Sequence, residues 1–290
     1  MISSTSSSLS HEQYLRKKRN KKLFRYGLVF FVFISLVALL SYISHRPQIR
    51  ISKIELSGGV LVTQDEIESK ALTGMSGSYL WLFPKNNSFL YSKTRLEDYL
   101  MDNFKRIDTI SIRRKNLKTL VIDITERKPV AMWCEGVPTD VQPSGSKDVL
   151  SSPERTCYFI DQNSTVFANA PHFSGDAYFR YYGLILNDNP IGKEYMASSR
   201  VFTELSGFIQ KTKDLLLQPQ YLVAKNDGQF SLFVAGGGEI MFDMKESLSK
   251  TSDNLVALLR VPALQLNSDG VLPVEYIDLR YGNKLFYKLK

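Results

Sequence analysis

The chain has 290 residues, of which 43% are hydrophobic and 12% aromatic, so it is a folded protein of one or two domains rather than a disordered one. Its net charge of +8 would favour nucleic-acid binding if it covered a folded surface, but +6 of it lies in residues 1–25. Such a basic tail is typical of a membrane-topology signal, and no nucleic-acid partner is expected.

An uncharged apolar segment, Tyr26–Ser44, follows the basic tail. As a helix it would span about 28 Å, close to the roughly 30 Å hydrocarbon core of a bilayer. The sequence "SYISHRP" at its end lacks the small-residue pattern of a signal-peptide cleavage site. We therefore expect an uncleaved transmembrane helix over 26–44, with the tail 1–25 in the cytoplasm and residues 45–290 on the other side.

Residues 49–127 follow a β-α-α-β-β pattern. Both helices open with a Thr and a Glu at capping-box spacing, and the last two strands alternate apolar and polar residues. The expected elements are a strand over 50–58, helices capped by Thr63 with Glu66 and by Thr94 with Glu97, and strands over 107–114 and 118–128.

The segment between these two helices, residues 74–89, contains Gly, Pro and several aromatic residues and is typical of a connection. Trp81 and Phe83 lie within it. Large aromatic side chains are most often buried, so we expect both in the core, and an exposed binding edge is the alternative.

Two cysteines, Cys134 and Cys157, lie on the far side of the expected membrane helix, where oxidation is permitted. They bracket residues 135–156, which are rich in Pro, Ser and Gly and are typical of a loop. A disulfide at the base of this loop and two partly buried free thiols are both compatible with the spacing.

Residues 128–290 are richer in strands. Two amphipathic helices, expected over 198–216 and 245–262, interrupt them. The expected strands cover 129–134, 157–168, 220–225, 229–236 and 238–243 and the closing segment 274–290. The fold class is therefore α+β, with one N-terminal transmembrane helix, a β-α-α-β-β domain, and a mixed β-sheet domain with flanking helices.

The chain closes with a strand, a Gly282-Asn283 turn and a second strand. A two-residue turn would pair Tyr281 with Lys284 and Leu279 with Phe286, although a bulge at the turn would change which side chains face outward.

The last strand, residues 284–289, could be a sheet edge, which offers unpaired backbone N–H and C=O groups to a partner strand. The alternative is that Leu285, Phe286 and Tyr287 only fill the core.

The sequence contains no P-loop, no dinucleotide-binding glycine motif and no zinc-ligand pattern. Ser247–Lys250 and Ser252–Asn254 match S-x-x-K and S-D-N, but they overlap on one predicted helix, where neighbouring side chains point in different directions. We interpret them as a solvated polar face and His172 as an ordinary loop residue. We expect no catalytic residue, no metal and no cofactor.

Three motifs follow the N-terminal anchor in order: "ITERKPVAMW", "YFIDQNSTVF" and "YIDLRYGNKLFYK". They are similar to E-R-x-P-V-A-x-W, I-D-x-x-G-x-V-F and D-[LM]-R-Y of the bacterial cell-division family FtsQ, also called DivIB. The resemblance covers residues 16–290. Ser164 stands where this family usually has Gly.

This resemblance implies a POTRA domain over 49–127 and a β-domain over 128–290. It implies a non-enzymatic scaffold of the divisome, held in the cytoplasmic membrane at the division septum by residues 26–44. The implied partners are FtsB-like and FtsL-like membrane-anchored division proteins, and the implied role is to localise and regulate septal peptidoglycan synthesis.

In the family, a partner segment adds as a strand to the last strand of the β-domain, and the Arg of D-[LM]-R-Y pairs with a partner acid. Carried over to this chain, that arginine is Arg280, and Lys284 and Lys288 would attract an acidic partner. The expected partner-binding residues are Arg280, Tyr281, Lys284, Leu285, Phe286, Tyr287 and Lys288.

Two other function classes remain open. A POTRA-containing transport or outer-membrane assembly factor would lead into a membrane barrel, for which the sequence shows no set of lipid-facing strands. A membrane-anchored cell-wall enzyme would require a catalytic constellation, and the sequence offers none.

Overall fold

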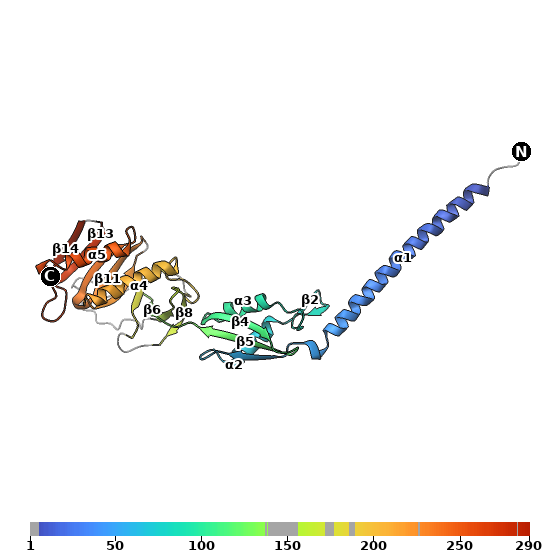
Figure 1. Cartoon of the computed structure of the whole chain (residues 1–290), viewed down its shortest axis with the longest axis horizontal. Coiled ribbons are helices and arrows are strands. Elements are labelled where there is room, and N and C mark those ends of the chain that lie inside the picture. Colours follow the sequence, from blue (N-terminus) through green and yellow to red (C-terminus); the bar gives the residue numbers. More distant parts are fainter. Residues whose placement is uncertain are drawn as a thin grey trace. The chain divides into compact units, whose positions relative to one another are not determined.

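The computed structural model describes residues 6–136, 138, 156–171, 177–185, 189–225, 227–282 and 284–290. Contacts between residues divide the chain into two compact units, Met1–Glu126 and Arg127–Lys290. Figure 1 shows the long N-terminal helix and the elements of each unit.

Helix α1, Ser6–Ser44, contains the expected apolar segment. Its part Lys18–Ser44 is long and apolar enough to cross a membrane. Apolar side chains such as Phe30, Phe31 and Phe33 are exposed along it, which is consistent with a helix that spans a membrane. The helix begins at Ser6, so helical structure extends into the basic tail.

The rest of the first unit is a three-stranded sheet with two helices. The sheet order is β1-β5-β4, with β1 parallel to β5 and β5 antiparallel to β4. Its core contains the fully buried Ile54, Ile67, Leu100 and Ile122. The elements are η1 Pro47–Ile49, β1 Lys53–Ser57, α2 Gln64–Gly74, β2 Ser78–Tyr79, β3 Phe83–Pro84, α3 Lys93–Asn103, β4 Ile107–Arg114 and β5 Thr119–Glu126.

The two helix starts differ from each other. The capping box at Thr63 is confirmed, because Thr63 Oγ1 accepts from Glu66 N–H and Glu66 accepts from Thr63 N–H. The box at Thr94 is wrong, because α3 begins two residues earlier, at Lys93, and Ser92 is its N-cap. Glu97 accepts a hydrogen bond from Ile112 N–H of β4 at 3.0 Å instead.

A short hairpin, β2 and β3, interrupts the connection between α2 and α3. Its tip is the loop Leu80–Leu82, where Leu80 and Trp81 have φ of +49° and +60° and Leu82 N–H donates to Tyr79 O. Trp81 is 93% exposed, so the expectation that it lies in the core is wrong; Phe83 is partly buried. Positive φ at both central residues turns the chain sharply, and the tip side chains project beyond the hairpin.

The second unit is a nine-stranded mixed sheet in the order β14-β13-β12-β11-β10-β9-β6-β7-β8. Neighbouring strands are antiparallel except for β12 with β13, β10 with β9, and β6 with β9. The elements are β6 Ala131–Cys134, β7 Cys157–Ile160, β8 Val166–Ala170, β9 Arg180–Gly183, α4 Ser199–Asp214, β10 Pro219–Ala224, β11 Gln229–Val234, η3 Ala235–Gly237, β12 Gly238–Asp243, α5 Leu248–Leu258, η4 Pro262–Leu264, β13 Val274–Tyr281 and β14 Lys284–Leu289.

The main core of this unit lies between the sheet and the helices α4 and α5. Leu205 and Phe208 of α4 and Leu255 of α5 belong to one buried cluster with Phe242 and Ile277 of the sheet. A separate small cluster contains Met132, Cys134, Tyr182, Val223 and Phe233. Both helices were expected from their apolar periodicity, and both use that stripe to pack on the sheet.

Ser164 lies in the left-handed region, with φ of +70°, where glycine is favoured. Its side chain is fully buried, and its Oγ accepts a hydrogen bond from Met196 N–H at 2.8 Å. Asp161 Oδ1 fixes the same turn by accepting from Asn163 N–H and Thr165 N–H. These hydrogen bonds offset the cost of a side chain in this conformation.

Cys134 and Cys157 face each other across β6 and β7, with Cα atoms 4.1 Å apart, and form a disulfide. The spacing was compatible with a disulfide and with two free thiols, and the structure contains the disulfide. It closes a loop whose ends are separated by 23 residues.

Replacing both Cys134 and Cys157 with Ser should lower the free energy of unfolding by about 3 kcal/mol, because the bridge restricts a loop of this length in the unfolded chain. Urea unfolding, followed by the fluorescence of the adjacent buried Trp133 in a Trp81→Phe background, measures this change. An unchanged urea midpoint would show that the bridge does not stabilise the native state.

Candidate functional site

Strand β14 lies at one end of the nine-stranded sheet, and β13 is the one strand of the described residues that pairs with it. Tyr281 pairs with Lys284 as expected. The expected pairing of Leu279 with Phe286 is wrong, because Asp278 faces Phe286 and the register shifts between Asp278 and Tyr281. Gly282 opens the turn with φ of +64°, and Asn283 lies outside the described residues.

The apolar side chains of this ribbon divide between core and surface. Leu285 is partly buried against the main core. Phe286 is 49% exposed, and its ring lies edge-on to that of Tyr281, with centroids 5.4 Å apart. We call the exposed set Tyr281, Phe286, Tyr287 and Leu289 the edge surface. The core-filling alternative therefore holds for Leu285 but not for Phe286 or Tyr287.

Of the two lysines of β14, Lys288 forms an ion pair with Glu275 of β13, with Nζ 2.5 Å from Oε2. This hydrogen bond to the carboxylate raises the pKa of Lys288. Both side chains are more than half exposed, so the pair is screened by water and can exchange for another partner.

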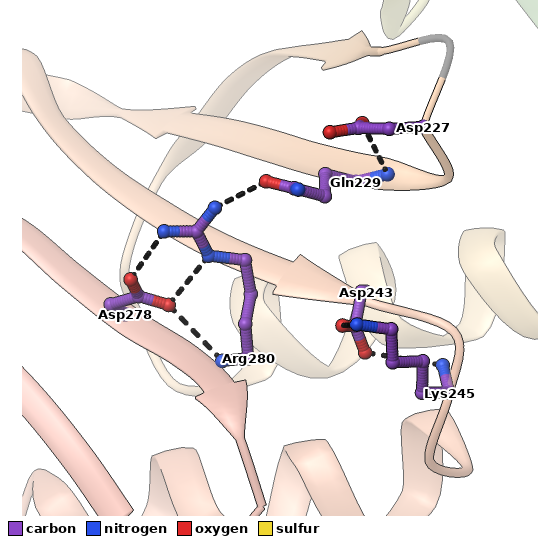
Figure 2. Close-up of polar contacts among 6 residues, drawn as sticks. All are labelled: Asp227, Gln229, Asp243, Lys245, Asp278 and Arg280. Carbon is purple, nitrogen blue, oxygen red and sulfur yellow. Dashed lines mark hydrogen bonds and ion pairs between the residues drawn. The ribbon is translucent and has the colours of Figure 1, made fainter.

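Arg280 is held by its own chain. Its Nε donates to Asp278 Oδ1 at 2.8 Å, one terminal nitrogen donates to Asp278 Oδ2 at 2.5 Å, and the other donates to Gln229 Oε1 (Figure 2). Figure 2 shows the guanidinium group spanning from β13 toward β11. These three bonds use three of the five N–H groups of the side chain.

The electrostatics of this pair are strongly coupled. The hydrogen bond from Arg280 to Asp278 raises the pKa of the guanidinium. Burial alone would raise the pKa of the Asp278 carboxyl, but the hydrogen bonds and charge of Arg280 outweigh burial and lower it. Asp278 is therefore ionised at neutral pH, and the pair fixes the end of β13.

A residue that the sequence reasoning missed holds the hairpin turn. Asn254 of α5 donates from Nδ2 to Gly282 O at 2.9 Å. It was part of the S-D-N match and was expected on a solvated face, and that expectation is wrong. No local sequence pattern could have predicted this role of Asn254, because the contact joins residues 28 positions apart.

The other residues of that match do not converge on one point. Ser247 is the N-cap of α5, and its Oγ accepts from Lys250 N–H. Lys250 Nζ lies 3.1 Å from Glu246, and the Ser252 side chain is buried. His172 lies outside the described residues. Within the described part of the chain, no three His, Cys, Asp or Glu side chains form a possible metal site.

The opposite edge of the sheet, β8, is partly covered by the chain itself. Val166 N–H donates to Lys193 O, Gly192 N–H donates to Val166 O, and Thr165 forms a bridge with Glu194. The two ends of the sheet therefore differ: residues 192–194 protect β8, whereas the edge surface lies on β14.

No protein-family model matches this sequence, and no curated protein matches it as a relative.

Replacing Arg280 with Ala should lower the free energy of unfolding by about 2–3 kcal/mol at neutral pH, because the carboxylate of Asp278, 8% exposed, loses its charged partner. A carboxyl whose pKa is lowered by folding stabilises the fold above its unfolded-state pKa, about 3.9, and this contribution disappears as the pH falls through the folded-state value. The difference from wild type should therefore be full at pH 7 and shrink below about pH 4.

Urea unfolding of both proteins at several pH values checks this result. Lys288→Ala is the matched control, because it removes a cation from an exposed ion pair of the same ribbon and should change stability little at any pH. Equal stability of wild type and Arg280→Ala at pH 7 would contradict the role given to the Arg280–Asp278 pair.

Proposed function

We propose that this chain is a membrane-anchored, non-enzymatic scaffold of the bacterial divisome, of the FtsQ/DivIB type, which binds a partner strand along β14. The observation that carries the proposal is an edge strand with exposed Phe286, Tyr287 and Leu289 whose one described neighbour is β13. The three ordered motifs of the sequence support the proposal that the scaffold is of the FtsQ/DivIB type.

The first unit supports the same assignment. Its elements run β1, α2, α3, β4, β5, with the β2–β3 hairpin inserted between the helices, and the sheet order is β1-β5-β4. We propose that this unit is a POTRA domain. Helix α1 would hold it at the outer surface of the cytoplasmic membrane, with the basic tail in the cytoplasm.

Binding would occur by addition of a strand. The backbone groups on the outer side of β14 would supply affinity that does not depend on sequence, and the edge surface would supply apolar contacts. Lys284 and Lys288 favour a partner segment that carries Asp or Glu. FtsB-like and FtsL-like division proteins are the proposed partners.

Arg280 would act as a preorganised donor in this complex. Asp278 and Gln229 fix the guanidinium group, so an incoming carboxylate would meet it without the loss of its side-chain entropy. Asp278 already pairs with the guanidinium of Arg280. A carboxylate of the partner would therefore bind the same guanidinium together with Asp278.

Replacing Phe286 with Ala should weaken partner binding at least about tenfold, the loss typical of a central aromatic contact of more than 1.4 kcal/mol. The measurement is co-purification of the tagged full chain from detergent-solubilised membranes, with quantification of FtsB-like and FtsL-like proteins. Leu216→Ala is the matched control, because Leu216 is an exposed aliphatic side chain in the turn after α4 and not on the edge surface.

Equal retention of partners by wild type and Phe286→Ala would show that the edge surface is not the docking site. Failure of the wild type to retain any division protein would overturn the divisome assignment itself. Hydrolysis of peptidoglycan by the purified chain would favour the enzyme alternative.

A further inference from the structure

The tip of the β2–β3 hairpin, Leu80–Leu82, is an exposed apolar segment of the first unit and carries its most exposed aromatic side chain outside α1. Leu80 is 82% exposed and Trp81 is 93% exposed, and both have positive φ. Nearby Phe89 and Leu90 are also exposed. Neither the core of the unit nor the proposed docking edge on β14 uses these side chains.

Two sets of hydrogen bonds attach this hairpin region to the last turn of α1. Ser41 Oγ donates to Leu82 O at 2.7 Å. Asn87 Nδ2 donates to Ser44 O at 3.2 Å and to Ser44 Oγ at 2.9 Å. Asn87 and Ser44 are both buried, so this attachment is shielded from water and geometrically defined.

These hydrogen bonds fix the position of the hairpin tip along the axis of α1. Ser41 lies three residues before the end of α1 at Ser44, which is about 4.5 Å along the helix axis. The apolar segment also ends at Ser44. The carbonyl of Leu82 therefore lies beside the last turn of the apolar segment and not beyond it. With α1 across a bilayer, this is the level of the membrane interface.

Aromatic and basic side chains near the C-terminal end of α1 lie side by side, as is typical of residues at a membrane–water interface. The guanidinium of Arg46 lies 4.5 Å from the ring centroid of Tyr42, and Lys85 Nζ lies 5.9 Å from that of Tyr79. Arg114 lies over the exposed ring of Phe89. Trp and Tyr favour the headgroup region of a bilayer, and Lys and Arg beside them can reach lipid phosphates.

We propose that the hairpin tip, Leu80–Leu82, together with Phe89, inserts into the interfacial region of the extracytoplasmic leaflet and holds the first unit against the bilayer. Arg46, Lys85 and Arg114 would contact lipid phosphates around the inserted side chains. The inference rests on α1 crossing the membrane and is independent of strand addition at β14.

Site-specific fluorescence of the full chain in lipid vesicles tests this insertion. The two cysteines of the chain form the disulfide, so one introduced cysteine is the single free thiol. An environment-sensitive nitrobenzoxadiazole probe would be placed at Trp81→Cys. The vesicles contain phosphatidylcholine and phosphatidylglycerol, with or without phosphatidylcholine that carries a doxyl group near the headgroup end of the acyl chain.

The probe at position 81 should emit at shorter wavelength than in water and lose intensity with the shallow doxyl lipid. Val60→Cys is the matched control, because Val60 is also highly exposed and follows β1 at the end of that strand away from α1. Its probe should emit as in water and keep its intensity. Leu36→Cys, within the apolar segment, should be quenched by a deep doxyl lipid.

Water-like, unquenched emission at position 81 with quenching at position 36 would overturn the insertion while α1 still spans the bilayer. A blue shift at position 81 without doxyl quenching would also overturn it, because a protein surface would then cover the tip. Absence of quenching at position 36 would overturn both this inference and the membrane anchoring in the proposed function.

Discussion

The pairing of β14 with β13 is the contact on which the proposed docking edge depends. An edge strand satisfies its backbone groups on one side only, so it must be held by that ladder and by side chains. Leu285 supplies the core contact, and Asn254 of α5 fixes the turn at Gly282 O. The Arg280–Asp278 pair fixes β13 itself. These contacts keep β14 extended while Phe286, Tyr287 and Leu289 stay at the surface.

The motif residues that suggested the family have structural roles in the units to which they belong. Glu126 accepts three successive backbone N–H groups in the loop after β1, each at 2.8 Å. Arg127 pairs with the buried Asp161, and Trp133 Nε1–H donates to Gly183 O at 2.9 Å. Charged and aromatic residues in such motifs can therefore recur for reasons of folding, because each satisfies backbone or buried polar groups that would otherwise remain unpaired.

Local patterns predicted much of the architecture. Apolar periodicity located α2, α4, α5 and most strands, and the spacing of Thr63 and Glu66 located a helix start, because these signals act within a few residues. The exposure of Trp81, the irregular register of β13 and the Asn254 contact depend on distant parts of the chain, so periodicity could not supply them. The pairing of Arg280 with Asp278 is local in sequence, because the two residues are only two positions apart. It was still not predictable, because a carboxylate two residues before an arginine is common in strands and does not by itself indicate an ion pair.

The two exposed apolar ribbons, one at the β2–β3 tip and one at β14, are fixed in the same way. The hydrophobic effect is non-directional, so apolar contacts alone cannot determine which way a ribbon with few core contacts points. In each case an asparagine side chain supplies the direction, Asn87 by donating to Ser44 of α1 and Asn254 by donating to Gly282. An amide is suited to this role, because it donates with defined geometry and carries no charge to desolvate. Each ribbon is therefore held in a fixed position while several of its apolar side chains stay exposed.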